Sequence, residues 1–129
     1  MAIDIPQNLY YTREHEWIYI EGEDVAVVGI TDFAQDQLED IVYLELPEVG
    51  TPVAESEPFG TIEAVKAVED LFAPVTGEII EVNHLLEEKP ELCNLDPYGD
   101  GWIIKIKFTD KSELDSMLSA KDYSALVEK

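Results

Sequence analysis

Residues 60–77 read GTIEAVKAVEDLFAPVTG, and this stretch decides the fold expected for the chain. Its β-branched and apolar residues predict two short strands, 59–64 and 68–73, joined by a tight turn. Pro74 ends the second strand because proline has no backbone N–H to donate to a neighbouring strand. Lys66 lies in the turn, so we expect its side chain to stand at the tip of a hairpin.

Lys66 is isolated among acidic residues. It is the only lysine or arginine between Arg13 and Lys89, a span that holds twenty aspartates and glutamates. A lone cation on a hairpin tip is most often a solvated surface residue.

The composition of the 129 residues limits the classes of function. Hydrophobic residues make up 46%, which is enough for a folded core, and the net charge is −21 with a sequence pI near 4.1. Such a surface repels phosphate backbones and anionic lipids, so we expect neither a nucleic-acid partner nor a membrane partner. An acidic surface of this kind favours association with proteins that have basic docking faces.

Few residues suit catalysis or metal binding. His15 and His84 are the only histidines, and one cysteine cannot complete a zinc site, so we expect no metal. A single Cys93 excludes an internal disulfide, as expected in a reducing compartment, and we interpret it as a core residue. Residues 1–6 lack the basic and apolar regions of a signal peptide, there is no Arg-rich transit segment, and no run approaches about 18 apolar residues. We therefore expect a cytoplasmic protein.

The rest of the chain also reads mostly as strands. Apolar runs separated by turn residues predict strands at 8–11, 17–20, 25–30, 41–46, 77–83 and 102–108. Thr31 caps a short helix after Ile30, and further helices at about 111–128 begin with a capping-box pattern at Asp110 and Glu113. We expect a mainly β fold, a flattened antiparallel β-sandwich. It is one domain over 1–129, with a core hairpin region at about 41–83.

The chain resembles the glycine cleavage H-protein family over nearly its whole length. The motifs that carry the resemblance are HEW at 15–17, VGITD at 28–32, LPEVG at 46–50, EAVKA at 63–67, APVTGE at 73–78 and GWIIKI at 101–106. Biotinyl domains flank their lysine with methionines, whereas Val65 and Ala67 stand here, and ordinary lipoyl domains usually have aspartate in place of Val65. Ala64 departs from the serine of many H-proteins. The resemblance implies a lipoyl-domain-like barrel-sandwich hybrid.

A short internal repeat agrees with that architecture. PEVGTPV at 47–53 and PVTGEII at 74–80 share the pattern Pro-x-x-Gly-x-x-Val/Ile. In each copy, proline ends a strand, glycine supplies a turn and a strand restarts. Lipoyl domains have a near-two-fold hairpin architecture in which the modified lysine lies in one of two related turns.

The resemblance also implies site residues. Lys66 would carry covalent lipoate as lipoyl-lysine, and Glu63 and Val65 would be recognised by the lipoylating enzyme. Three further residues would form a cleft that receives the arm, two of them as polar contacts and one as an apolar wall. These are Glu16, Asp70 and Ile30. The alternative is that both acids simply belong to the acidic surface.

By the same resemblance, the chain is a carrier and not an enzyme. A pyridoxal-phosphate glycine decarboxylase (P-protein) would load an aminomethyl group on the arm, and an aminomethyltransferase (T-protein) would pass it to tetrahydrofolate. Dihydrolipoyl dehydrogenase (L-protein) would then reoxidise the dithiol, and a lipoyl ligase or transferase would attach the cofactor. We expect a bacterial-type monomer of glycine catabolism and one-carbon metabolism that shields the labile group from water.

Two other carrier roles stay open at this point. The chain could relay lipoate to 2-oxoacid dehydrogenases. It could also be an acyl carrier that uses Ser116, since the chain is acidic and LDSM at 114–117 resembles a phosphopantetheine site. The acyl-carrier reading has less weight, because the serine in that family begins a helix of an all-helical bundle and most of this chain is strand.

Overall fold

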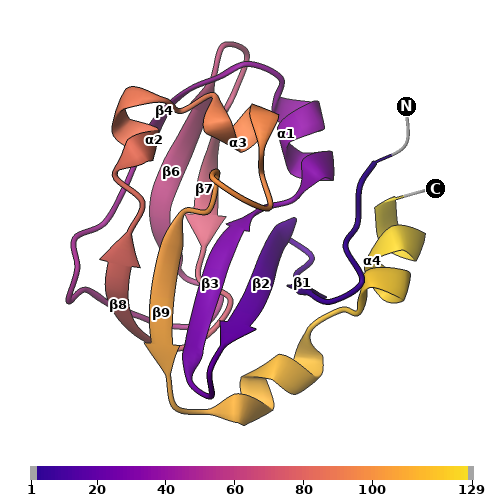
Figure 1. Cartoon of the computed structure of the whole chain (residues 1–129), viewed down its shortest axis with the longest axis vertical. Helices are drawn as coiled ribbons and strands as arrows, with labels where there is room; N and C mark the ends of the chain where they lie inside the picture. Colours follow the sequence, from indigo (N-terminus) through magenta and orange to yellow (C-terminus); the bar gives the residue numbers. More distant parts are fainter. Residues whose placement is uncertain (1–2, 128–129) are drawn as a thin grey trace.

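Two antiparallel sheets form the framework of the computed structural model, which describes residues 3–127 (Figure 1). One sheet has the strand order β1-β2-β3-β9-β8-β5, and the other has the order β4-β6-β7. The strands are β1 (Tyr10–Tyr11), β2 (Glu16–Glu21), β3 (Val25–Ile30), β4 (Ile41–Glu45), β5 (Pro52–Val53), β6 (Pro58–Ala64), β7 (Val68–Phe72), β8 (Gly77–Val82) and β9 (Ile104–Phe108). The helices are α1 (Asp32–Leu38), α2 (Leu85–Glu88), α3 (Leu92–Leu95), the 3₁₀ helix η1 (Lys111–Ser116) and α4 (Ala120–Val127).

The inward faces of both sheets meet in one apolar core. In β9, Ile104, Ile106 and Phe108 are buried, whereas Lys105 and Lys107 alternate with them on the wetter face, as the sequence predicts. The same core takes side chains from β2, β3, β6, β7 and β8. The expected flattened antiparallel β-sandwich is therefore confirmed.

A second apolar cluster covers part of the outer face of the six-stranded sheet. Its buried members are Tyr11, Trp17, Val27, Ala120 and Tyr123. Helix α4 lies beside β1 at the edge of this sheet (Figure 1), and the backbones of residues 11 and 118 exchange hydrogen bonds of 2.9 and 2.8 Å there. Strand β3 is apolar throughout and buried from Ala26 to Ile30, because both of its faces have packing partners, whereas in β2 Trp17 and Ile18 are buried and Tyr19 is exposed.

The helices lie where the sequence predicts them, but their lengths differ from the prediction. Thr31 caps α1 as predicted, since its Oγ1 accepts a 3.1 Å hydrogen bond from the N–H of Ala34. The helical region expected at 111–128 is divided into η1 and α4, and residue 128 lies outside the described residues. Strand β9 begins at Ile104 and not at 102, because the N–H of Trp102 donates to Gly99 in the preceding turn.

The two copies of the internal repeat pair with each other. Strands β5 and β8 are antiparallel, with Pro52 opposite Glu78 and Val53 opposite Gly77. The Ile79 backbone accepts a 2.7 Å bond from the N–H of Gly50 and donates a 2.9 Å bond to residue 51. The repeat is therefore a structural pairing as well as a sequence pattern.

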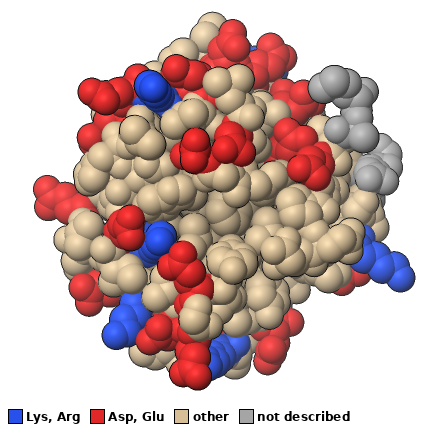
Figure 2. Space-filling model, in the orientation of Figure 1, with Lys and Arg blue, Asp and Glu red and all other residues tan. Residues whose placement is uncertain are grey.

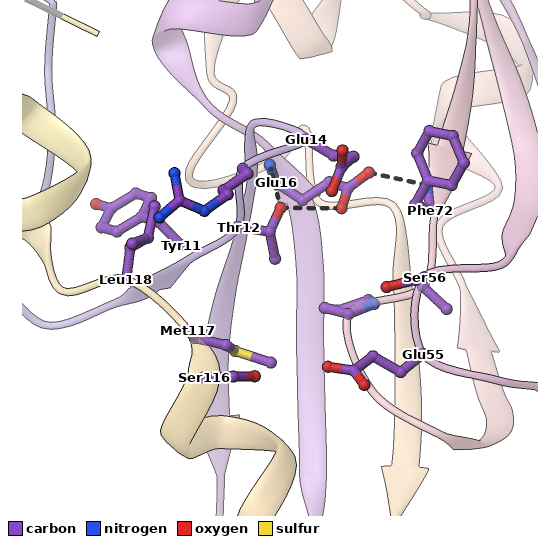
Figure 3. A pocket seen from close by; sticks show the side chains of 13 residues that line it. Tyr11, Thr12, Glu14, Glu16, Glu55, Ser56, Phe72, Ser116, Met117 and Leu118 are labelled. Carbon is purple, nitrogen blue, oxygen red and sulfur yellow. Dashed lines mark hydrogen bonds between the residues drawn. The ribbon is translucent and has the colours of Figure 1, made fainter. Parts of the chain in front are cut away.

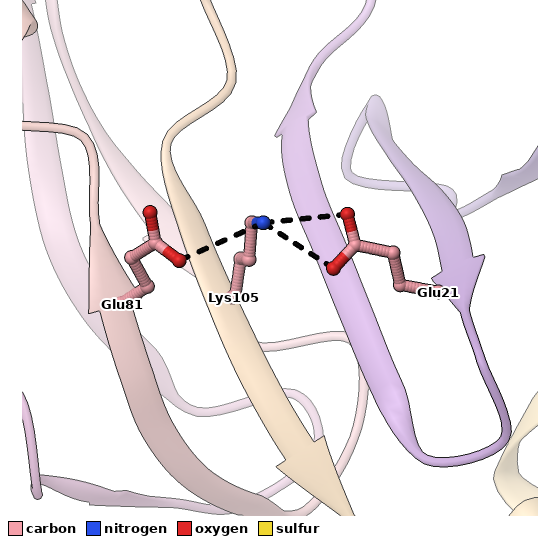
Figure 4. Close-up of polar contacts among 3 residues, drawn as sticks. All are labelled: Glu21, Glu81 and Lys105. Atoms are coloured by element: carbon pink, nitrogen blue, oxygen red, sulfur yellow. Dashed lines mark hydrogen bonds and ion pairs between the residues drawn. The ribbon is translucent and has the colours of Figure 1, made fainter.

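Charges on the outer face of the six-stranded sheet are organised around one lysine. The Nζ of Lys105 lies 3.2 Å from Glu21 and 3.6 Å from Glu81, on the two sides of it (Figure 4), and 5.4 Å from the ring centre of Trp102. Figure 2 shows acidic side chains at the upper and lower margins of this face and a largely uncharged band between them. Each such pair contributes at most about 1 kcal/mol.

Gly60 offers a test of how tightly β4 and β6 are packed. A Cβ at this position would overlap the carbonyl oxygen of Glu45, which is backbone and cannot rotate away. We expect Gly60→Ala to lower the free energy of unfolding by about 1–3 kcal/mol, measured by urea denaturation. Gly22→Asn is the matched control, because Gly22 has φ +62° with nothing near it and asparagine tolerates that backbone. An equal loss in both variants would contradict the packing argument.

Candidate functional site

The turn that carries Lys66 is held by backbone hydrogen bonds on both sides. The N–H of Ala64 donates to Ala67 across the turn at 2.7 Å, and the N–H of Val65 donates to Asp40 at 3.0 Å. Val65 itself is 77% exposed. The tip, at the upper edge of Figure 1, therefore combines an ordered backbone with accessible side chains.

The amine of Lys66 is accessible and is paired with one acid. Its Nζ lies 3.0 Å from Oε2 of Glu39, and both side chains are more than half exposed. Glu39 follows α1 and has a positive φ of 64°. An exposed pair of this kind contributes little stability, so it does not prevent an enzyme from reaching the amine.

Glu63 lies on β6 close to the tip. It pairs with Val68 on β7 and with Tyr43 on β4, so the three residues form one row across the three-stranded sheet. Val68 and Tyr43 are exposed, and Glu63 is half-buried. An enzyme that surrounds Lys66 would meet this row together with Val65.

A cleft of ≈ 500 Å³ begins beside the tip and runs between α1 and β7. Ala67, the residue after Lys66, is part of its lining. The cleft brings together Glu16, Ile30 and Asp70, the three residues that the sequence grouped by resemblance. Its apolar walls are Ile30, Phe33, Ala34, Leu38, Ile62 and Leu71.

The register of the sheet explains part of this grouping. Glu16 begins β2 directly opposite Ile30, the last residue of β3, so both side chains reach the cleft from the same sheet edge. Asp70 comes from β7 on the other side and is exposed. Sequence reasoning missed His15 and Phe33, although Phe33 and Gln37 are one helical turn apart on α1 and both line the cleft.

Glu16 is the buried acid of the cleft. Its side chain is 2% exposed, and its Oε2 accepts a 2.9 Å hydrogen bond from the N–H of Phe72 on β7. The hydroxyl of Thr12 lies 3.2 Å from Oε1, and Figure 3 shows both contacts. Burial raises the pKa of Glu16 from its ordinary value of 4.5 to about 8, more than these hydrogen bonds lower it.

Glu16 also borders a second, smaller hollow of ≈ 150 Å³ on the side of Ser56 and Met117 (Figure 3). Glu16 therefore lines both cavities. A group with a pKa near 8 is largely protonated at neutral pH, and a cation brought beside it would favour its ionised form. The arrangement can thus hold a cationic group at the buried end of the cleft, beside its apolar walls.

Other reactive groups of the chain are placed less favourably. Among residues 3–127, no three or more His, Cys, Asp or Glu side chains are positioned to hold a metal ion. Cys93 is fully buried in the core, and this burial raises the pKa of its thiol to about 12. Ser116 ends a 3₁₀ helix, where a phosphopantetheine serine would begin a helix. No helix in the described part of the chain is long and apolar enough to cross a membrane.

The two-sheet sandwich, with an exposed lysine at a hairpin turn, has the architecture of lipoyl-carrying domains. The glycine cleavage H-protein family matches residues 9–129. A glycine cleavage system H protein from Bacteroides thetaiotaomicron is 56% identical over 125 residues, covering 97% of this chain and 98% of that protein. One from Rubrobacter xylanophilus is 55% identical over 125 residues, covering 97% and 96%.

A solved structure agrees with these relatives. The crystal structure of a glycine cleavage system H protein from Mycobacterium marinum superposes with a TM-score of 0.89 at 38% identity, covering 97% of this chain and 100% of that one. The chain belongs to the glycine cleavage H-protein family. Its fold and its family together exclude the acyl-carrier alternative at Ser116.

The raised pKa of Glu16 predicts how stability depends on pH. Between about pH 4.5 and 8 the folded chain holds a proton at this residue that the unfolded chain has lost, so the free energy of unfolding falls as pH rises. Glu16→Gln resembles the protonated acid, because its amide oxygen can accept from the N–H of Phe72 while its NH₂ group donates to the hydroxyl of Thr12. Relative to wild type, we expect the variant to gain at least about 2 kcal/mol between pH 5 and pH 8, measured by urea denaturation. A difference that is the same at every pH would contradict the assignment.

Proposed function

We propose that Lys66 carries lipoate in amide linkage and that this chain presents the arm to the other components of the glycine cleavage system. The observation that carries the proposal is the position of Lys66. Its amine is exposed on an ordered turn, and the next residue, Ala67, lines a cleft that contains a buried acid. Family membership gives the same class of function, a carrier component of that system.

The chain's residues fit the proposed group in three respects. A primary amine on an exposed turn is available for amide formation, and the resulting amide is neutral. From the Cα of Lys66 to the sulfurs, the arm would span about 14 Å over roughly a dozen bonds. A cleft of ≈ 500 Å³ with apolar walls offers space for an aliphatic stem and a five-membered ring. When bound, lipoate supplies a disulfide that accepts a carbon unit and two electrons.

The cleft residues would protect what the arm carries. Ile30 and the other apolar walls exclude water. Glu16 supplies a buried carboxyl that ionises when a protonated amine approaches, and Asp70 adds a second carboxylate at the exposed rim. The proposed role of these residues is therefore binding and exclusion of solvent, with no chemical step of their own.

The proposed protein partners are the enzymes that would load, unload, reoxidise and attach the lipoyl arm. We propose that the glycine decarboxylase, the aminomethyltransferase and dihydrolipoyl dehydrogenase each receive the arm, and that a lipoyl ligase or transferase installs it. A net charge of −21 favours basic docking faces on these proteins and makes association faster at low salt. Glu63 and Val65, which flank the turn, would be contacts of the lipoylating enzyme.

The attachment site is tested by mass. Lys66→Arg keeps the charge but cannot form the amide, so we expect a folded protein that gains no lipoyl mass when incubated with lipoate, ATP and a lipoyl ligase. Lys89→Arg, another exposed lysine, is the control and should be modified as completely as wild type. Lipoylation of the Lys66→Arg variant would show that the site lies elsewhere.

The cleft is tested by the lifetime of the loaded carrier. In Glu16→Gln the buried carboxyl can no longer ionise, and a charged hydrogen bond is worth about 1.5–3 kcal/mol. We therefore expect release of ammonia from carrier loaded with the glycine-derived unit to be at least about tenfold faster than in wild type. Glu78→Gln, an exposed acid on β8, is the control and should release at the wild-type rate. A change below about twofold in Glu16→Gln would mean that the load is not held there.

A further inference from the structure

The hydroxyl of Tyr123 joins three distant segments of the chain. Tyr123 belongs to α4, is fully buried and stacks on Tyr11 with ring centres 4.7 Å apart and planes 8° apart. Its Oη lies 2.9 Å from Nδ1 of His15 and 2.7 Å from Oγ1 of Thr31. Through the single Oη atom of Tyr123, helix α4 therefore contacts both His15, which precedes Glu16, and Thr31, which caps α1.

One arrangement of the protons in this network uses the hydroxyl of Thr31 as a donor. Oγ1 of Thr31 accepts from the N–H of Ala34 and can donate its own proton to Tyr123. The Tyr123 hydroxyl then donates to Nδ1 of His15, which makes His15 a neutral imidazole with its proton on Nε2. The reverse order, from Nδ1 of His15 to Tyr123 and on to Thr31, would leave the Thr31 proton with no acceptor among the hydrogen bonds of the described residues.

The two residues that Tyr123 contacts shape the wall of the cleft. His15 has a positive φ of 69° and packs against Phe33 with ring centres 4.8 Å apart, and both rings line the cleft. Thr31 fixes the first turn of α1, from which Phe33 and Ala34 project. The cleft wall opposite β7, formed by His15 and the first turn of α1, is therefore hydrogen-bonded to the buried Tyr123 on the side away from the cleft.

Charged groups around His15 come from several elements. Glu14 lies beside it in the chain, Glu16 follows on β2, and Arg13 and Asp70 line the same cleft. Burial lowers the pKa of His15, and the charge of Glu14 opposes this effect. Protonation of His15 would turn Nδ1 into a donor and would force the hydroxyl chain to reverse.

We propose that Tyr123 is a positioning residue of the cleft: its hydroxyl sets the tautomer and orientation of His15 and, through Thr31, the first turn of α1. The inference rests on the proposed function only in so far as the cleft receives the arm. It gives α4 a role in the site, although α4 lies at the other end of the sequence from His15 and contributes no residue to the cleft lining.

Tyr123→Phe tests the proposal, because it removes one oxygen and keeps the ring that stacks on Tyr11. The matched control is Tyr11→Phe. Tyr11 belongs to the same stack and is equally buried, and its hydroxyl bonds to Pro6 and not to the network. A loss that follows from weaker packing alone would be seen in both variants.

Three measurements separate positioning from stability. In Tyr123→Phe we expect the ¹⁵N signals of His15 to show a loss of the Nε2–H preference and a shifted titration. We expect amide exchange at Ala34 to be at least about tenfold faster, and release from the loaded carrier to be at least about threefold faster. Tyr11→Phe should leave all three unchanged.

Each other outcome overturns the proposal. Unchanged ¹⁵N signals would mean that Tyr123 does not set the imidazole, and altered signals with unchanged release would mean that the network does not hold the cleft. If wild type gains no lipoyl mass, the proposed function fails, while the ¹⁵N and exchange measurements on the unmodified chain still decide the positioning.

A second pair of variants covers the case in which Tyr123→Phe does not fold. The Thr31 hydroxyl reaches the imidazole through Tyr123, so Thr31→Val should alter the ¹⁵N signals of His15 while Thr31→Ser, which keeps a hydroxyl, should preserve them. Equal signals in the Val and Ser variants would contradict the chain of hydroxyls.

Discussion

The hydrogen bond from the backbone of Phe72 to the side chain of Glu16 joins the two sheets inside the protein. Strand β7 belongs to the three-stranded sheet and β2 to the six-stranded sheet, so this 2.9 Å contact crosses between layers that otherwise meet through apolar side chains. A buried donor left without its acceptor costs about 1–3 kcal/mol, so the acid and the end of β7 need each other. Ile30 lies opposite Glu16 in register, so an apolar and an acidic side chain line the cleft beside this polar contact.

Local features of the sequence predicted most of the framework. The hairpin around Lys66 follows from strand-forming residues on both sides of a turn and from Pro74 after it. The capping role of Thr31 follows from residue type and spacing, and the internal repeat marks the two places where a strand restarts after a proline, at β5 and at β8. These features depend on neighbours in the chain, where a single sequence carries its strongest information. The grouping of Glu16, Ile30 and Asp70 needed a family resemblance as well.

Contacts between distant residues could not be predicted in the same way. Tyr123 lies 108 residues from His15, and nothing in either segment indicates that the two side chains meet. The pattern at Asp110 and Glu113 suggested a capping box, but the Glu113 carboxylate instead accepts 2.7 Å bonds from the N–H and the hydroxyl of Thr76. The tertiary partner replaced the local one because it offers two donors at once. Which partner a side chain finds is decided by how whole elements pack against each other. The spacing of residues within one element carries no information about that packing.

The burial of Cys93 has a consequence for redox chemistry. Thiolates, not thiols, attack disulfides, and a thiol with a pKa of about 12 is almost never ionised at neutral pH. Cys93 is also fully enclosed by the core, so another molecule cannot approach its sulfur. A chain that carries a strained cyclic disulfide on Lys66 would cross-link to its own copies if it displayed a reactive thiol. By enclosing its single sulfhydryl, the protein keeps this thiol out of mixed disulfides.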